Sequence, residues 1–263
     1  MTLVGSVNVG TLRIGYRRSG RGSPLLLLHG FFGDSRIWRW QLDALSADFA
    51  VVAWDCPGCG ESTDPPAGFT LTDYADVLAE FVRALSLERP ALIGLSFGGA
   101  LALELARRHR EIPSALVVAD GYAGWSGSFP PDVVQRRLEQ SLPDLDLPRD
   151  QVAEKWVRGF LTDAAPPDLV EEVGHVIAGF HRHGMDAMIR ALAYADLREG
   201  LDKIEAPTLL LWGEMDVRSP LTVAEDLHAR IPESRLVVIP GAGHLSNAEK
   251  PDEFSREVRE FLS

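Results

Sequence analysis

The sequence predicts an α/β fold, in which a wound and mostly parallel sheet is covered by helices on both faces. Short apolar runs rich in branched side chains recur along the chain, and uninterrupted apolar runs are typical of strands that are buried on both faces. Segments with helical spacing separate these runs, and this alternation is the pattern of parallel strands joined by crossover helices. The predicted strands of the wound sheet span 24–28, 49–54, 91–95, 115–119, 208–212 and 236–239.

The first segment of the chain predicts a different element. Residues 3–9 and 11–17 flank Gly10 and alternate between apolar and polar side chains, which indicates an antiparallel hairpin at the edge of the sheet. After the hairpin, helices follow the strands in the order that a wound sheet requires. The predicted helices span 35–45, 72–85, 97–108, 221–230 and 252–262.

The alternation of strands and helices breaks after Asp120. The segment 121–205 contains no convincing buried strand, and its helical spacing is broken by prolines. We therefore expect two parts: a core of residues 1–120 and 206–263, and a helical cap of residues 121–205 inserted between two strands of the core. The helices predicted within the cap span 132–142, 149–161, 169–181 and 185–194.

Composition and charge exclude several classes of protein. The chain has 263 residues, of which 46% are hydrophobic, so it can bury a large core and does not resemble a disordered protein. Its 26 basic and 38 acidic residues give a net charge of −12, and such a surface repels nucleic acid and anionic membranes. Apolar runs are far shorter than the roughly 20 residues that span a bilayer, and no basic leader precedes an apolar segment. We expect a cytoplasmic monomer or homodimer that acts on a small molecule.

The most informative motif is Gly94-Leu95-Ser96-Phe97-Gly98, a G-x-S-x-G sequence that follows a predicted strand and precedes a predicted helix. This context holds the serine at the apex of a strained turn with its hydroxyl exposed, and the glycines are needed because strand and helix pack closely. The start of the helix presents free backbone N–H groups, which stabilise developing negative charge. The motif therefore predicts a nucleophilic serine.

Two further residues follow predicted strands. Asp216 lies in the loop after strand 208–212, and His244 lies in the loop after strand 236–239. Ligands of open α/β sheets bind beyond the carboxyl ends of the strands, so we expect both loops to meet Ser96 at one rim. A serine hydroxyl needs an imidazole to accept its proton, and the imidazole needs a carboxylate to orient it. The order Ser, Asp, His is also the order expected for this type of turn.

Attack on an ester creates an oxyanion, which needs two backbone N–H donors. Phe97 follows the nucleophile and is expected to supply one of them. The other is expected from Phe31, in the segment 29–33 that follows the strand 24–28. His29 begins this segment and is interpreted as a supporting residue rather than a catalytic one.

These motifs together resemble the α/β-hydrolase family over nearly the whole chain. Five matches occur in the same order: His29-Gly30, the turn at 55–62, the serine turn at 94–98, the acid loop at 213–220 and Gly243-His244. The resemblance implies an eight-stranded, mostly parallel sheet, a cap inserted after the sixth strand and no cofactor. The chain is similar to the branch of carboxylesterases, lactonases and enol-lactonases that keeps serine at the position of Ser96. Haloalkane dehalogenases and epoxide hydrolases carry aspartate at the position of Ser96.

Three residues at the start of the cap have open roles. Asp120 also ends a predicted strand, and some members of the family take their acid from that position. We favour Asp216, because it precedes His244 by one loop within a complete acid-loop pattern. Asp120 is then expected either to hold the chain where it enters the cap or to contact the substrate. Tyr122 and Trp125 are candidates for the substrate pocket, because they open the cap segment.

Neither cysteine nor histidine clusters predict a metal site. Cys56 and Cys59 form a C-x-x-C sequence, but the chain has no second cysteine pair to complete a zinc site, and the surrounding residues indicate a turn. No disulfide is expected. His181 and His183 stand two positions apart in a predicted helix, so their side chains face different directions.

The sequence thus predicts a serine hydrolase that cleaves a small or medium-sized ester or lactone through an acyl-enzyme. The same triad could instead cleave a C–C bond or an amide, or form peracids from short acids. A third hypothesis is a ligand receptor that keeps the hydrolase fold and turns over slowly. The cap sets specificity in this architecture, and its residues follow no pattern that identifies the substrate.

Overall fold

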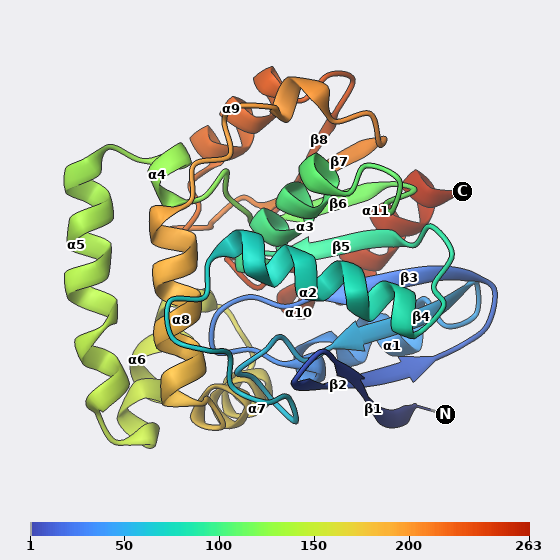
Figure 1. Ribbon diagram of the computed structural model, residues 1–263. Coiled ribbons are helices and arrows are strands. Elements are labelled where there is room, and N and C mark those ends of the chain that lie inside the picture. The colour runs from blue at the N-terminus through green and yellow to red at the C-terminus, as the bar shows by residue number, and fades with distance from the viewer. Residues whose placement is uncertain (1) are drawn as a thin grey trace.

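The computed structural model describes residues 2–263, and its centre is an eight-stranded sheet (Figure 1). The strands are β1 (Leu3–Val9), β2 (Leu12–Ser19), β3 (Ser23–Leu28), β4 (Phe49–Trp54), β5 (Ala91–Leu95), β6 (Leu116–Ala119), β7 (Thr208–Gly213) and β8 (Arg235–Ile239). They lie in the order β1-β2-β4-β3-β5-β6-β7-β8. The pairs β1–β2 and β2–β4 are antiparallel, and the other neighbouring pairs are parallel. The predicted sheet, with its hairpin at one edge, is confirmed.

Helices cover both faces of this sheet, which explains why the central strands are continuous apolar runs. Every residue of β5 and β6 is buried. In Figure 1, α2 and α3 lie over one face, whereas α1 and α11 lie over the other. The core helices are η1 (Ser35–Trp38), α1 (Arg39–Ala44), α2 (Leu71–Ala84), α3 (Phe97–Arg108), α9 (Leu221–Arg230), α10 (Ser246–Glu249) and α11 (Pro251–Leu262).

The start of α2 illustrates how local sequence sets a helix boundary. The Thr70 hydroxyl accepts the backbone N–H of Asp73, and the Asp73 carboxylate accepts the backbone N–H of Thr70. This capping box satisfies two N–H groups that the first turn of a helix leaves without partners. The Asp73 charge also complements the positive end of the helix dipole. The helix therefore begins at Leu71, one residue before its predicted start.

The cap is inserted between β6 and β7 and stands at the end of the sheet where the parallel strands terminate (Figure 1). Because β6 and β7 are neighbours in the sheet, the insertion leaves the core continuous. We keep residues 121–205 as the proposed bounds of the cap. Its helices are α4 (Trp125–Ser128), α5 (Pro131–Ser141), η2 (Pro143–Asp146), α6 (Arg149–Phe160), α7 (Pro167–Ala178), α8 (Arg182–Tyr194) and η3 (Leu201–Lys203).

Cap and core approach each other closely at two glycines. A Cβ atom added to Gly184 in α8 would overlap the backbone oxygen of Gly58, which follows β4. Gly58 itself has a φ of 85°, in the region where glycine is favoured. The pair lets two backbones touch where larger residues would separate them. A hydrogen bond of 2.8 Å between His181 and Asp64 joins the two parts nearby.

Across residues 2–263, no helix combines the length and the apolar character that crossing a lipid bilayer requires.

Candidate active site

Ser96 lies in the turn between β5 and α3, in a backbone conformation with φ 56° and ψ −114°. Such a positive φ strains a residue that has a Cβ atom, and strain of this kind concentrates at functional sites. The neighbouring glycines make the turn possible: a Cβ on Gly98 would overlap the carbonyl oxygen of Leu28, and one on Gly94 would overlap the backbone of Gly98. The turn therefore holds the hydroxyl of Ser96 at the carboxyl end of the sheet.

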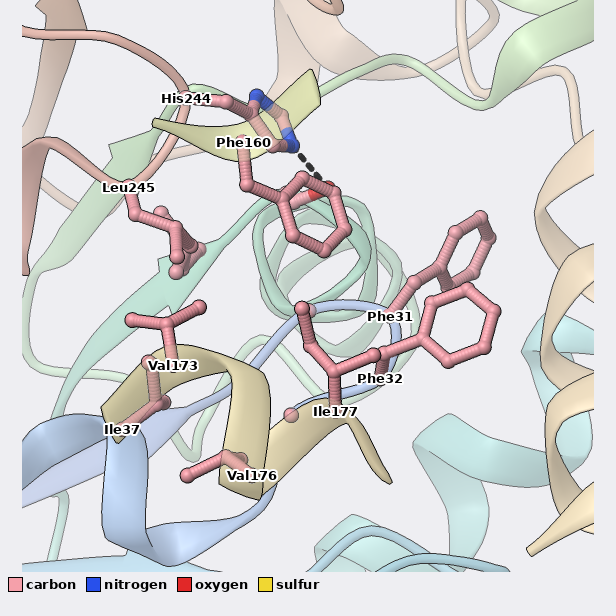
Figure 2. Close-up of a pocket in the computed structure, with 13 residues that line it drawn as sticks. Phe31, Phe32, Ile37, Phe160, Val173, Val176, Ile177, His244 and Leu245 are labelled. Carbon is pink, nitrogen blue, oxygen red and sulfur yellow. Dashed lines mark hydrogen bonds between the residues drawn. The ribbon is translucent and has the colours of Figure 1, made fainter. Parts of the chain in front are cut away.

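A continuous chain of hydrogen bonds links Ser96 to a carboxylate. The Ser96 hydroxyl lies 2.9 Å from Nε2 of His244 (Figure 2), and Nδ1 of the same ring lies 2.8 Å from Oδ2 of Asp216. A carboxylate only accepts, so Nδ1 carries the proton and Nε2 is free to accept from the serine. Ser96 and His244 are 5% and 3% exposed, so the substrate reaches them only if side chains or the cap move.

Asp216 is held rigidly by the backbone of its own loop. Its Oδ1 accepts the N–H groups of Arg218 at 2.7 Å and Ser219 at 2.9 Å, while Oδ2 faces His244. Both oxygens therefore have partners although the side chain is fully buried. A buried and hydrogen-bonded carboxylate of this kind can fix the tautomer of an imidazole and stabilise its cation.

Asp120 is also completely buried, but it contacts different groups. Its carboxylate accepts the backbone N–H of Gly213 at 2.7 Å and the hydroxyl of Ser246 at 2.5 Å. Burial, reinforced by the negative charge of Asp216, raises the pKa of the Asp120 carboxyl well above its usual value. Of the two candidate acids, the structure thus places Asp216 on the imidazole and Asp120 between the ends of β6, β7 and α10.

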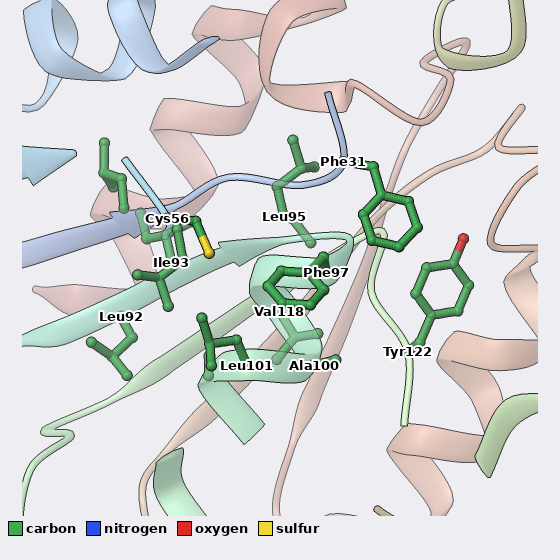
Figure 3. Close-up of a cluster of buried hydrophobic side chains, with 14 of the residues drawn as sticks. Phe31, Cys56, Leu92, Ile93, Leu95, Phe97, Ala100, Leu101, Val118 and Tyr122 are labelled. Atoms are coloured by element: carbon green, nitrogen blue, oxygen red, sulfur yellow. The ribbon is translucent and has the colours of Figure 1, made fainter. Parts of the chain in front are cut away.

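The amides of Phe31 and Phe97 flank the same serine. Within residues 2–263, neither backbone N–H has a protein acceptor. Gly30 brings the first segment close, because a Cβ there would lie 2.9 Å from the Cβ of Ser96. The two phenyl rings lie beside each other, with centroids 5.8 Å apart, at the end of the core cluster that Figure 3 shows. Two free N–H donors next to the serine can stabilise an oxyanion.

His29 fixes the segment that carries Phe31. Its Nε2 accepts the backbone N–H of Cys56 at 3.0 Å, so Nδ1 carries the proton and donates to the carbonyl of Gly30 at 2.8 Å. Desolvation lowers the pKa of this buried imidazole and keeps it neutral. His29 does not contact Ser96 or His244 through a hydrogen bond among the described residues, which suits the supporting role that was predicted.

A narrow apolar cavity opens next to Ser96, with about 350 Å³ of empty space (Figure 2). Its walls come from the segment after β3 and from the cap helices α6 and α7. Phe160 of α6 stacks on the imidazole of His244, with ring centroids 5.6 Å apart. The other apolar residues of the wall include Phe31, Phe32, Ile37, Val173, Val176, Ile177 and Leu245. This space suits a small acyl or alcohol group.

Asp120, Tyr122 and Trp125, the pocket residues predicted from sequence, do not line this cavity in the described chain. Tyr122 lies behind it, with its ring 6.4 Å from that of His244, and burial raises the pKa of its hydroxyl to about 12. Trp125 packs edge-on against Phe31, with ring centroids 5.8 Å apart. The lining residues from α6 and α7 were not predicted. Their apolar helical spacing was visible in the sequence, but the spacing does not say which face of the core they meet.

The cysteines and histidines outside the site form no metal centre. Cys56 and Cys59 are free and buried, and burial raises the pKa of both thiols well above the usual range. Residues 2–263 hold no group of three or more His, Cys, Asp or Glu side chains placed to bind a metal ion.

Comparison with known proteins then identifies the family. A sequence profile described as the alpha/beta hydrolase family matches residues 25–257. The chain belongs to this family. The putative carbamate hydrolase RutD of Cronobacter turicensis is 31% identical over 89% of each chain. The pimeloyl-[acyl-carrier protein] methyl ester esterase of Vibrio atlanticus is 28% identical over 92% of this hydrolase-family chain and 95% of the esterase.

Solved structures of this hydrolase family agree with the fold. A thermophilic esterase from Thermogutta terrifontis, crystallised with malate, is 29% identical and superposes with a TM-score of 0.89, covering 99% of this chain and 98% of its own. An enol-lactonase from Burkholderia xenovorans is 24% identical, with a TM-score of 0.89 over 98% and 99% of the two chains, and this likeness shows the fold alone. The hydrolases among these relatives support a hydrolase activity for this family member.

Proposed function

We propose that this protein is a serine hydrolase that cleaves a small or medium-sized carboxylic ester or lactone through an acyl-enzyme. Ser96 is the nucleophile, His244 the general base and acid, and Asp216 the residue that orients His244. The backbone amides of Phe31 and Phe97 form the oxyanion hole. The observation that carries the proposal is the hydrogen-bonded chain from the Ser96 hydroxyl through His244 to Asp216, at 2.9 and 2.8 Å.

The chemistry follows from these contacts. His244 removes the proton of Ser96 as the hydroxyl oxygen attacks the ester carbonyl, and the developing oxyanion accepts hydrogen bonds from the amides of Phe31 and Phe97. His244 then returns the proton to the leaving alcohol, and the acyl group stays on Ser96. Water repeats the steps in reverse: His244 deprotonates it, the acyl-enzyme is attacked, and Ser96 leaves with the proton. For a lactone, the leaving alcohol and the acyl group belong to the same product.

The proposed activity is tested by hydrolysis of 4-nitrophenyl esters from acetate to decanoate. Wild-type protein should release nitrophenol with an optimum at short chain lengths, because the apolar cavity next to Ser96 is narrow. Ser96→Ala should lower kcat by roughly a million-fold, as loss of a nucleophile does. Ser114→Ala removes a hydroxyl from an exposed residue and should retain wild-type activity. A folded Ser96→Ala protein that keeps the activity would contradict the assignment of the nucleophile.

Carbamate hydrolysis is a second candidate for the same residues, and relatives of 31% and 30% identity named as putative carbamate hydrolases favour it. A carbamate carbonyl accepts the same attack by serine, and it differs in the nitrogen that flanks the carbon. The isosteric substrates ethyl butyrate and ethyl N-ethylcarbamate distinguish the two activities by their kcat/KM values. Ester cleavage that exceeds carbamate cleavage supports the primary proposal, and the reverse order replaces it with a carbamate hydrolase.

A further inference from the structure

A second cavity lies between the cap and the loop that carries Asp216, and its charge is positive. It encloses about 740 Å³ of empty space, including its open mouth. Its charged lining consists of Arg137 from α5, Lys155 from α6, Arg218 from the loop after β7, and a single carboxylate, Asp144. Three cations against one carboxylate give this cavity a net positive charge, although the chain as a whole carries −12. We call it the arginine cavity.

The one carboxylate that lines the arginine cavity, Asp144, already has hydrogen-bond partners. Asp144 accepts hydrogen bonds from Nζ of Lys155 at 2.6 Å and from the indole N–H of Trp156 at 3.0 Å. Within the described chain, neither Arg137 nor Arg218 forms an ion pair with any carboxylate. Arg136, the neighbour of Arg137 in α5, instead pairs with Asp132 at 2.6 Å on the outside of the cap. Two guanidinium groups therefore face the cavity without a carboxylate of residues 2–263 in ion-pair contact, although the charges of Asp144 and Asp216 act on Arg218 from nearby.

Aromatic rings hold both guanidinium groups in place. Arg137 lies over Phe129 at 4.1 Å and over Trp125 at 5.3 Å, and it donates to the carbonyl oxygen of Arg218 at 2.6 Å. The guanidinium carbon of Arg218 lies 4.3 Å from the ring centroid of Trp156 and 5.0 Å from that of Phe160. A guanidinium stacked on a ring keeps its N–H edge for hydrogen bonds.

Two further observations point to a missing acceptor in the arginine cavity. The indole N–H of Trp125, which also lines the cavity, is buried and has no acceptor within residues 2–263. Burial, together with the like charge of Arg137, also lowers the pKa of the Arg218 guanidinium, and the nearby charges of Asp216 and Asp144 do not offset this effect. A bound carboxylate would supply both the acceptor oxygens and the charge.

Two aromatic side chains lie between the arginine cavity and the candidate active site. Phe160 lies under Arg218 on one side of this wall and stacks on His244 on the other. Trp156 lines the arginine cavity and contacts Phe32 of the apolar cavity, with ring centroids 4.4 Å apart. The guanidinium of Arg218 and the imidazole of His244 thus lie 5.0 and 5.6 Å from the centre of the Phe160 ring, and we expect a substrate chain that passes Phe160 to reach both.

We propose that the arginine cavity binds a carboxylate of the substrate, and that the preferred substrates are therefore esters or lactones that carry a carboxylate a few bonds from the cleaved carbonyl. This inference rests on the proposed function of Ser96 and names its substrate class. Arg137 and Arg218 bind the carboxylate, and Trp125 donates a further hydrogen bond. None of the three takes part in bond cleavage.

The test uses two pairs of esters that differ only in charge. Mono-4-nitrophenyl glutarate and 4-nitrophenyl pentanoate place a carboxylate or a methyl group at the end of equal acyl chains. 4-Carboxyphenyl butyrate and 4-methylphenyl butyrate make the same comparison on the alcohol side. Rates are corrected with Ser96→Ala protein. We expect one carboxylated ester to exceed its neutral partner in kcat/KM by about tenfold or more, as charge-assisted hydrogen bonds give.

The variants locate this preference. The Arg137→Gln, Arg218→Gln double variant should bring the ratio of the two kcat/KM values close to one. Arg136→Gln removes an equal charge from the same helix outside the cavity, and it should leave the ratio within about twofold of wild type, because exposed charges act weakly. Equal rates within both ester pairs, or an equal loss of the ratio in Arg136→Gln, would overturn the proposal.

A binding measurement separates this inference from the proposed function. Glutarate and pentanamide are titrated into wild-type protein and into the arginine double variant by calorimetry. If no ester is cleaved in a Ser96-dependent way, the proposed function fails, and glutarate binding decides the inference. If glutarate binds wild-type protein more tightly than pentanamide does, and if the double variant binds the two ligands equally, the result supports carboxylate binding in the arginine cavity. Equal binding of the two ligands would overturn it and so would an unchanged affinity in the variant.

Discussion

At the scale of single residues, the backbone of Ser96 connects strain with reactivity. Its φ of 56° is unfavourable for a side chain, and the packing of β5 against α3 maintains it. The same turn leaves the first N–H groups of α3 without partners in the helix. One local conformation therefore places the hydroxyl at the carboxyl end of the sheet and supplies the donor at Phe97. An ordinary turn would provide neither.

The two buried aspartates give the first prediction at this scale. Asp216→Asn should lower kcat by about a thousand- to ten-thousand-fold, because an amide cannot hold His244 in the tautomer that accepts from Ser96. Asp120→Asn should lower kcat by less than about tenfold, since its partners are Gly213 and Ser246 rather than His244. An amide also resembles the uncharged form that the raised pKa of Asp120 favours. Steady-state kinetics on one 4-nitrophenyl ester measure both effects.

The reverse result has a clear meaning. If Asp120→Asn loses activity as completely as Asp216→Asn while both proteins keep their circular dichroism spectra, then Asp120 is the acid that acts on His244. That outcome would also require the imidazole to rotate away from the geometry described here.

At the scale of elements, the contact between α8 and the loop after β4 determines how the cap sits on the core. Gly184→Ala should lower the free energy of unfolding by about 1 to 3 kcal/mol, because the new methyl group overlaps the backbone of Gly58. Gly174→Ala is the matched control in α7, where the nearest atom to a new Cβ is Val157 Cγ2 at 3.8 Å. This control should raise stability by up to about 1 kcal/mol through helix propensity.

Urea denaturation of both glycine variants measures these changes. Equal stability of Gly184→Ala and wild-type protein would show that the cap shifts at no cost in free energy. The close approach of α8 to the core would then have no role in positioning the cap.

Most of these elements could be predicted from sequence, and the exceptions have a common cause. The strands β4 and β5 and the helices α3 and α9 match their predicted ranges, because buried runs and strong helix formers leave little ambiguity. The cap helices α5, α6, α7 and α8 were predicted as helices, whereas the short helices α4, η2 and η3 were not. Their contacts were not predictable, since apolar spacing shows that a helix has a buried face without naming the partner of that face. The packing of Phe160 on His244 and of Arg218 on Trp156 are two such contacts that the sequence does not predict.

Some residues of the candidate site could likewise be predicted from sequence, and others could not. Ser96, Asp216, His244, Phe31 and Phe97 could be predicted because each lies in the turn or loop that follows a strand, and the carboxyl ends of parallel strands meet at one edge. The residues of the arginine cavity come from α4, α5, η2, α6 and the loop after β7, and nothing in their spacing brings them together. Local rules thus predict the candidate reacting groups, while the proposed selection of substrate depends on packing between distant segments.

At the scale of the whole molecule, the two cysteines report on separation of cap and core. Sγ of Cys59 lies 3.3 Å from the sulfur of Met188 in α8, and both cysteines are buried with raised thiol pKa values. We expect neither thiol to react with 5,5′-dithiobis(2-nitrobenzoate) in the native protein, because the thiolate is scarce and the reagent cannot enter. In concentrated guanidinium chloride both should react. Absorbance of the released thiolate follows the reaction.

Fast reaction of either cysteine in the native protein would contradict this prediction. It would mean that the cap opens widely and often, rather than through the local side-chain movements that reach Ser96.

The distance along the chain between Ser96 and His244 has a consequence for how the enzyme is made. They are hydrogen-bonded partners, yet 148 positions separate them. Protein synthesis proceeds from the N-terminus, and the segments emerge from the ribosome in that order. The proposed nucleophile and the proposed oxyanion amides therefore emerge first, the cap second, and the proposed acid and base last. A nascent chain that ends before His244 carries the serine without its proposed base, so we expect the growing polypeptide to gain hydrolytic activity only as translation nears completion.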